Sequence, residues 1–342
     1  MSEYFHSQIA GSGPSEGCCF MTKNMTQEQV ILALTAVMFV VFALTLPGFL
    51  SANNLIALLR SVAVLGMLGV AMVIVVIGRG IDLSLVANMA ISTAWTLSLV
   101  QNGYSVSVAL ALGFGLAVAV GLFIGVFVAY SDMLPLFATL AVGTFVYGFG
   151  RFQLIPVDVV PLPANFGWLG DLGSATVVGI PVSILATALL GLIIFLFLRY
   201  TKPGQFIYAI GDNPRAASIA GVPVRKVQVL QYAAAGAIAF LAGLITALTV
   251  SSMSTRVVNS TLIYDVILVV VVGGVGLSGG RGNVRNVFVG TLLIGTLQNG
   301  MTILDFQYTT QNVMKSLLLL SAIIADSIVN PRDEQTDQQG DI

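Results

Sequence analysis

RYTKPGQFIYAIGDNPRAASIAGVPVRK, residues 199–226, separates two stretches that contain no charged side chain, residues 172–198 and 227–255. It carries five of the fourteen Lys and Arg residues of the chain. Uncharged apolar stretches of about 20 residues predict membrane-spanning helices, and positive residues collect in the cytoplasmic loops between such helices. We therefore expect residues 199–226 to lie on the cytoplasmic side of a membrane, with a short helix in their middle.

The composition predicts an all-α, polytopic membrane protein. Hydrophobic residues make up 57% of the 342 residues and charged residues only 8%, whereas a soluble domain has about 25% charged residues. The mean hydropathy is +0.96. Thirty-six glycines fit close helix packing in lipid. The net charge of -1 argues against binding to nucleic acid, which requires a basic surface.

Hydrophobic blocks predict about ten membrane spans. They are residues 30–49, 55–77, two spans within 83–131 divided by QNGYS at 101–105, 134–152, 181–198, 227–250, 262–273, 284–301 and 313–329. Residues 156–179 form a longer outer loop, with Trp168 as an interfacial anchor. The predicted domain is residues 29–330, between a flexible tail at 1–28 and a polar tail at 331–342.

The distribution of positive charge predicts the orientation. An even number of spans puts both termini on one face. With both termini and residues 199–226 inside, ten Lys and Arg residues lie inside. Only Arg60, Arg151, Arg256 and Lys315 lie outside. We therefore expect both termini to be cytoplasmic.

Two glycine-containing segments interrupt the apolar pattern. RGIDLSLVAN begins at Arg79 and VGLSGGRGN begins at Val275, and each follows a strongly apolar span. Glycine-interrupted spans in corresponding positions predict discontinuous helices beside a transport path, and an internal repeat. Ordinary helix ends at the cytoplasmic interface are the alternative interpretation.

Sequence motifs for chemistry are missing from the chain. Gly274, Gly276 and Gly279 match G-x-G-x-x-G, but no βαβ pattern surrounds them. The sequence contains no P-loop, its single histidine is His6, and Cys18 and Cys19 are adjacent. We expect no catalytic, metal or cofactor site in this chain, so that any ATP that drives it is hydrolysed by another subunit.

Four motifs together resemble a known family. They are GIDLS at 80–84, LPLFATLAVGTFVYGFGRF at 134–152, GDNPRAASIAGVPV at 211–224 and VVVVGGVGLSGGRGNV at 269–284. The sequence resembles the permease subunits of bacterial ATP-binding cassette importers of the ribose type, from about residue 30 to residue 330. The resemblance implies a non-enzymatic transport subunit for a monosaccharide or related polyol in the inner membrane. Its expected partners are ATPase subunits that bind ATP and Mg, a periplasmic sugar-binding protein and a second, identical or related permease chain.

The resemblance also implies a coupling helix that docks into the ATPase. The matching residues are Asp212, Asn213, Pro214, Ala216, Ala217, Ile219 and Gly221. Their chemistry agrees, because Asp or Asn caps a helix start, proline suits the first turn and glycine ends a helix. The alanines and the isoleucine are expected to form a small apolar face for the partner.

The sequence departs from the family pattern at several positions. Arg79-Gly80 stands where two glycines are usual, LVAN follows Ser84 in place of a valine-glycine pair, and Arg285-Asn286-Val287 replaces a glycine-threonine pair. Arg79 is three residues from Asp82, and we expect the two to pair, which neutralises a costly buried charge. These departures leave the identity of the substrate open.

Polar residues within the apolar spans are candidates for the pathway. They are Asp82, Ser84, Asn88, Trp95, Tyr147, Asp265 and Asn299. Each of them is as well explained, taken singly, by an interhelical hydrogen bond. Two other functions stay open at this point: a related permease for branched amino acids or nucleosides, and a secondary transporter coupled to protons or sodium.

Overall fold

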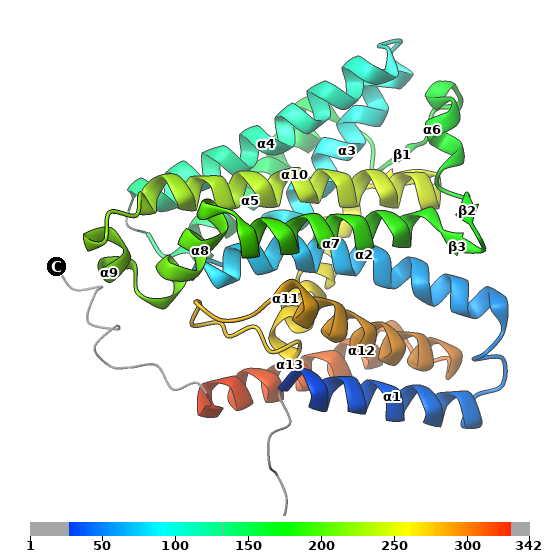
Figure 1. Ribbon diagram of the computed structural model, residues 1–342. Helices are drawn as coiled ribbons and strands as arrows, with labels where there is room; N and C mark the ends of the chain where they lie inside the picture. Colours follow the sequence, from blue (N-terminus) through cyan, green and yellow to red (C-terminus); the bar gives the residue numbers. More distant parts are fainter. Residues whose placement is uncertain (1–26, 132, 330–342) are drawn as a thin grey trace, which may run out of the picture.

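The structure, a computed structural model, describes residues 27–131 and 133–329. Its long helices run in broadly similar directions, and α8 and α9 lie together at one end of the molecule (Figure 1). The predicted tails at 1–28 and 331–342, with Cys18 and Cys19, lie outside the described residues, except that α1 already begins at Gln27.

Helices occupy all ten of the predicted span positions. They are α1 (Gln27–Thr45), α2 (Ala52–Ile77), α3 (Leu85–Gln101), α4 (Val106–Tyr130), α5 (Pro135–Phe149), α7 (Val182–Tyr200), α10 (Val224–Val250), α11 (Leu262–Val272), α12 (Val284–Ile303) and α13 (Tyr308–Val329). Among the described residues, α1, α2, α4, α7 and α10 are by themselves long and apolar enough to cross a membrane. The predicted all-α, polytopic architecture is confirmed.

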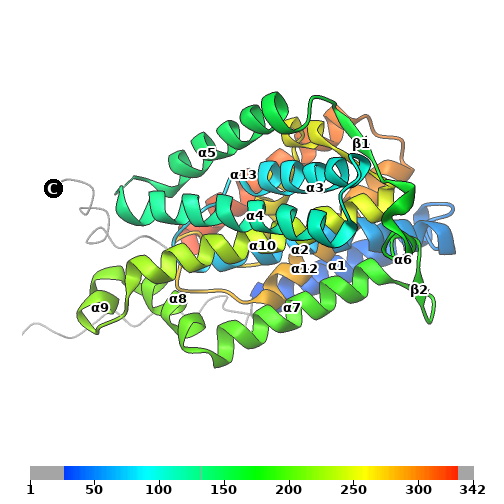
Figure 2. The ribbon, with the colours of Figure 1, turned by 90° about the horizontal axis from the view of Figure 1, so that it is seen from above.

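The remaining elements are short and join the long helices. They are η1 (Gly150–Leu154), η2 (Ala164–Phe166), α6 (Trp168–Asp171), α8 (Lys202–Asp212), α9 (Pro214–Ile219) and η3 (Thr255–Asn259). Strand β1 (Val159–Pro161) pairs antiparallel with β4 (Ser252–Ser254), and β2 (Thr176–Val177) pairs with β3 (Ile180–Pro181). The side chain of Trp168 is exposed, and α6, β2 and β3 lie at the end of the molecule opposite to α8 and α9 (Figures 1 and 2).

Helix α2 forms the centre of the packing. Every residue from Leu65 to Ile77 is buried. The helix packs against α7, α10, α11 and α12. In contrast, α1 and α13 carry many exposed apolar side chains, such as Val37, Leu317 and Leu320. This is the distribution expected of a bundle whose outer helices face lipid.

Small residues bring α4 and α10 into backbone contact. Figures 1 and 2 both show the two helices side by side. Gly113, Ala117, Gly121 and Gly125 recur every four residues on α4. A Cβ atom on Gly121 would lie 2.3 Å from the carbonyl oxygen of Tyr232, and one on Gly125 would lie 2.7 Å from the Cα of Val229. Helices in lipid pack by such close approach, because no hydrophobic force drives them together.

Two of the basic residues predicted to lie outside share one carboxylate. The guanidinium of Arg151 lies 2.6 Å from Asp158, and Arg256 pairs with the other carboxylate oxygen. Asp158 is next to β1, and Arg256 follows β4. These charges therefore hold together two loop segments that are about 100 residues apart.

Replacing Gly121 by alanine should destabilise the protein. Gly121→Ala places a methyl group against α10 and should lower the free energy of unfolding by about 1–3 kcal/mol, the usual effect of overpacking. Gly115→Ala on the same helix is the control, because no heavy atom lies within 4 Å of its added methyl group. Thermal unfolding of the purified variants in detergent measures the difference. Equal melting temperatures for the two variants would contradict the packing described for α4 and α10.

Candidate functional site

Residues 199–226 fold as two helices joined by a sharp corner. Asn213 caps α9 by accepting a hydrogen bond from the backbone N–H of Ala216 at 3.0 Å, and Pro214 occupies the first turn. Gly221 follows α9 with a φ of +85°, and its N–H donates to Ser218 O at 3.0 Å. The sequence prediction of a capped short helix at this position is confirmed.

Helix α8 was not recognised from the sequence. Its start is capped by Thr201, whose hydroxyl accepts from the N–H of Gly204 at 3.2 Å. Ile207 and Ile210 are buried, and the hydroxyl of Tyr208 donates to Gly282 O at 2.9 Å. Burial raises the pKa of Tyr208 above its ordinary value. The signal for α8 was present as Thr201 followed by Pro203, a capping residue and a proline of the first turn.

The apolar face of α9 differs from the predicted one. Ala217 is buried within the chain, whereas Ala216 is exposed and Ile219 is 89% exposed. The exposed apolar side chains of α9 are therefore Ala216 and Ile219, and Ala217 faces its own chain. The difference arises because a six-residue helix that packs on α8 and α10 must turn one of its sides inward.

Three backbones meet at the end of α2. The N–H of Gly280 donates to Ile77 O at 2.8 Å. A Cβ atom on Gly211 would lie 1.8 Å from that same oxygen and 2.3 Å from the nitrogen of Gly280. We call this contact of Ile77, Gly211 and Gly280 the glycine junction. It joins the last turn of α8, just before α9, to both of the glycine-containing segments.

Arg79 reinforces the glycine junction. Its Nε donates to Gly211 O at 2.7 Å and its Nη2 donates to Asp212 O at 2.9 Å. The predicted pairing of Arg79 with Asp82 is wrong: Asp82 is buried and accepts hydrogen bonds from Ser84, at 2.9 Å from its N–H and 2.5 Å from its hydroxyl. Arg79 instead bonds to the carbonyls of Gly211 and Asp212, which are farther from it in the sequence than Asp82 but adjacent to it in space.

The two glycine-containing segments are connections between helices. Residues 78–84 join α2 to α3, and residues 273–283 join α11 to α12. They touch each other, because a Cβ atom on Gly279 would lie 2.4 Å from Arg79 Cγ. Gly80 and Asp82 of the first segment are buried, whereas Arg281 of the second is exposed, so both interpretations stay open. The internal repeat stays a prediction.

The candidate pathway residues fall into separate groups. Asp82, Ser84 and Asn88 are buried at the start of α3, and Asn88 Nδ2 donates to Ala117 O of α4 at 3.0 Å. Trp95, farther along α3, is partly buried against the core. The hydroxyl of Tyr147 on α5 accepts from Asn259 Nδ2 at 3.3 Å.

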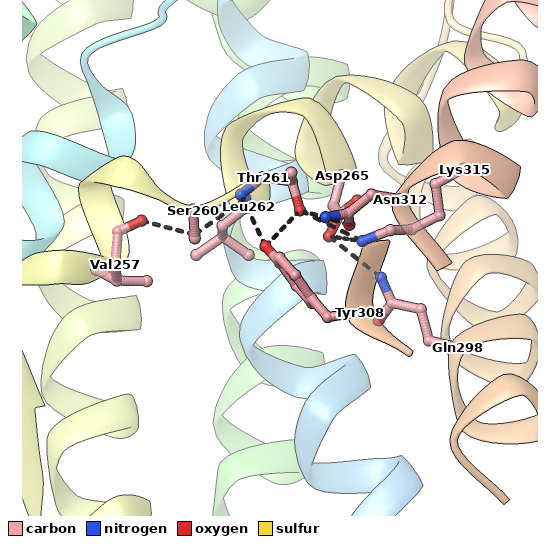
Figure 3. A network of polar contacts seen from close by, with 9 residues as sticks. All are labelled: Val257, Ser260, Thr261, Leu262, Asp265, Gln298, Tyr308, Asn312 and Lys315. Atoms are coloured by element: carbon pink, nitrogen blue, oxygen red, sulfur yellow. Dashed lines mark hydrogen bonds and ion pairs between the residues drawn. The ribbon is translucent and has the colours of Figure 1, made fainter. Parts of the chain in front are cut away.

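The two other candidates have partners that were not predicted. Asn299 of α12 and Asn54 of α2 exchange two amide hydrogen bonds of 2.8 and 3.0 Å. Asp265 of α11 forms an ion pair of 2.9 Å with Lys315 of α13 and accepts from Gln298 Nε2 at 3.2 Å (Figure 3). Lys315 was counted among the outer charges, but it is buried. A lone charge within an otherwise apolar span was the signal for this pair.

Metal chemistry finds no support in the described part of the chain. Within residues 27–131 and 133–329, no group of three or more His, Cys, Asp or Glu side chains is placed to hold a metal ion.

Comparison with known proteins identifies the family. The model of the family described as branched-chain amino acid transport system / permease component matches residues 54–324. The chain belongs to this permease family. It is 35% identical to the ribose import permease of Bacillus subtilis over 85% of this chain and 89% of that protein. No solved structure matches the chain.

Two further relatives of this permease are named for other sugars. The galactofuranose transporter permease of Escherichia coli is 33% identical over 80% of this chain and 79% of that protein. The L-arabinose transporter permease of Azospirillum brasilense is 31% identical, over 86% of both chains. The permease is thus a transport subunit and a multi-pass membrane protein, as the sequence predicted.

Replacing Arg79 of the permease by glycine should leave the protein more stable than replacing it by alanine. Its φ of +66° lies in the left-handed region, which costs an L-residue about 1–2 kcal/mol and costs glycine nothing. Both variants lose the two hydrogen bonds, but only Arg79→Gly relieves the backbone. Arg79→Ala should therefore be less stable by about 1 kcal/mol, measured by thermal unfolding in detergent. An alanine variant as stable as the glycine variant would contradict the conformation described for Arg79.

Proposed function

We propose that this chain is the transmembrane subunit of an ATP-binding cassette importer that moves a monosaccharide across the bacterial inner membrane. The observation that carries the proposal is the exposed, capped helix α9, whose base is fixed to the interior of the bundle by the glycine junction. The three relatives named above, all sugar permeases, support a monosaccharide as the substrate.

Helix α9 is the site at which the ATPase acts in this proposal. Ile219 and Ala216 give it an exposed apolar surface at a position that the positive-inside rule assigns to the cytoplasm. A single exposed isoleucine is ordinary on a protein surface, so the support comes from its place on a capped helix that is joined to the bundle at Gly211. A displacement of α9 reaches the segments 78–84 and 273–283 through Gly211, because these backbones are in direct contact.

The end of the molecule that carries α8 and α9 also sets the orientation of the chain in this proposal. The end of α13 lies on the side of the molecule that carries α8 and α9 (Figure 1). With residues 199–226 in the cytoplasm, the C-terminus is cytoplasmic too. The opposite end, with β1–β4 and α6, then faces the periplasm and is where a sugar-binding protein delivers its ligand.

In this proposal, partner subunits carry the ATP-binding motif that this chain lacks. ATP and Mg²⁺ bind to the partner ATPases, and two permease chains, identical or related, enclose one pathway. ATP biases the transporter toward one state because it binds the closed ATPase pair more tightly than the open pair, as any ligand-driven switch requires. This chain only changes conformation and makes no covalent bond.

Two other functions are less well supported. A proton- or sodium-coupled transporter uses an ionisable carboxylate near the midplane. Asp265 is already neutralised by Lys315, whereas the buried Asp82 is held by hydrogen bonds from Ser84. A permease for branched amino acids or nucleosides shares the machinery, and the family description names such amino acids. The names of the three relatives favour sugars over both.

Replacing Ile219 by aspartate should abolish ATPase binding. In membrane vesicles stripped of the ATPase and turned inside out, the wild-type chain should bind added ATPase, and Ile219→Asp should not, because a charge cannot enter an apolar groove. Val178→Asp is the control, since Val178 is 96% exposed at the opposite end of the molecule. The measurement is the amount of ATPase sedimented with the vesicles.

Three results of the ATPase experiment would count against the proposal. Full binding to the Ile219→Asp chain would reject α9 as the docking element. Loss of binding in the Val178→Asp control to the same extent would show that the effect is not specific to α9. Binding to vesicles of native orientation would reject the cytoplasmic assignment of residues 199–226.

A further inference from the structure

Helix α11 begins near the middle of the membrane. Its 11 residues extend for only about 16 Å, roughly half of the 30 Å hydrocarbon core of a bilayer. It ends at Val272, where the chain enters the segment that touches Ile77 and Gly211 at the end carrying α8 and α9. The start of α11, with Thr261 and Asp265, therefore lies at about the midplane. Residues 251–261, which include β4 and the short 3-10 helix η3, lead the chain inward to that depth (Figure 1).

Irregular backbone at that depth is tolerated only where it is buried in protein or lines a water-filled space. A cavity of about 230 Å³ lies beside the start of α11, between α11 and α13. Its polar lining consists of Thr261, Tyr264, Asp265, Asn312, Lys315 and Ser316. Leu268 and Leu319 give it an apolar wall. We call this space the α11–α13 cavity.

The polar side chains of the α11–α13 cavity are connected to one another. Lys315 Nζ lies 2.9 Å from Asp265 Oδ2 and 3.4 Å from the hydroxyl of Thr261. That hydroxyl donates to Asn312 Oδ1 at 3.2 Å, and it lies 3.2 Å from the hydroxyl of Tyr308 (Figure 3). A network of this kind positions hydroxyl and amide groups at the wall of the cavity while its two charges cancel.

The charge state of the cavity favours a neutral ligand. An amino acid would need a cation for its carboxylate and an anion for its ammonium group, but Lys315 and Asp265 already satisfy each other. A polyhydroxy compound needs donors and acceptors in equal measure, which threonine, asparagine, serine and tyrosine side chains provide. A volume of about 230 Å³ is equivalent to about eight water molecules at about 30 Å³ each, enough for a small ligand.

We propose that the α11–α13 cavity is a binding station for the transported monosaccharide, with Asn312, Thr261 and Ser316 as hydrogen-bonding groups and Tyr264 and Leu268 against its apolar face. The inference rests on the proposed function and adds to it the location of one sugar-binding site on the translocation path. Tyr264 and Ser316 are exposed in the single chain, so the station opens at the surface of the chain. The ion pair of Asp265 and Lys315 positions this wall and does not itself contact the sugar.

A cysteine-protection experiment tests the station in the assembled importer. Cys18 and Cys19 are the only cysteines of the chain, and both are first replaced by serine. Ser316→Cys places a thiol in the cavity, and Ser321→Cys places one on the same helix, exposed and outside the cavity lining. The complex with its ATPase is reconstituted in vesicles, its sugar-binding protein is supplied on the periplasmic face, and ATP-driven uptake of D-ribose, L-arabinose and D-galactose identifies a transported sugar. The rate of thiol labelling is then measured with that sugar and with leucine.

The expected result is selective protection at position 316. At a sugar concentration equal to the dissociation constant, half of the sites are filled, and labelling at position 316 should slow about twofold. Labelling at position 321 should not change, and leucine should protect neither thiol. In addition, Ser316→Trp, which fills the cavity, should lose most of its uptake, while Ser321→Trp should transport like the wild type.

The possible failures of the experiment are distinguishable. If the wild-type complex takes up none of the three sugars with ATP, the proposed function itself is contradicted. If it takes up a sugar but the thiol at position 316 is not protected, and Ser316→Trp transports normally, the station is rejected and the proposed function stands. A cavity that holds a lipid acyl chain gives that second result.

Discussion

The close approach of three backbones at the end of α2 is the contact on which the rest of the structure depends. At the glycine junction, Gly211 leaves no room for a side chain, since a Cβ atom would lie 1.8 Å from Ile77 O. This contact holds the end of α8 against both glycine-containing segments, and Arg79 adds two hydrogen bonds to carbonyls of the same turn. Because Gly211 and Gly280 have no side chains, their backbones lie in direct contact with each other and with Ile77 O. In the proposed mechanism, this direct contact carries movement of α9 into the bundle.

The same physical rule appears at two other places in the bundle. Gly121 allows α4 to touch the backbone of α10, and Gly273 lies where a Cβ atom would be 2.3 Å from Asn286 O. In lipid, such contacts replace the hydrophobic force that packs soluble helices. Polar groups then supply the specificity: the amide pair of Asn54 and Asn299 joins α2 to α12, and the ion pair of Asp265 and Lys315 joins α11 to α13.

Local features of the sequence were sufficient to predict the ten long helices and α9, although α8 was missed. QNGYS at 101–105 separates α3 from α4, and Asn213, Pro214 and Gly221 mark the ends of α9, because capping and turn chemistry act between near neighbours. Contacts between distant residues were not predictable in this way. Arg79 was assigned to Asp82, three residues away, but its acceptors are more than 130 residues away. Likewise, the span at 262–273 was predicted with about the length of α11, but the contact of its Asp265 with Lys315 of α13 is a tertiary feature that the sequence does not show.

The central claim is that this chain forms the translocation path and that a separate ATPase subunit moves it through α9. The most direct test is sugar accumulation by vesicles that contain the purified chain, with and without its ATPase and binding protein. The account predicts that accumulation requires ATP and the ATPase, and that the chain alone accumulates nothing under a proton or sodium gradient. Uphill accumulation by the chain alone under such a gradient would contradict it.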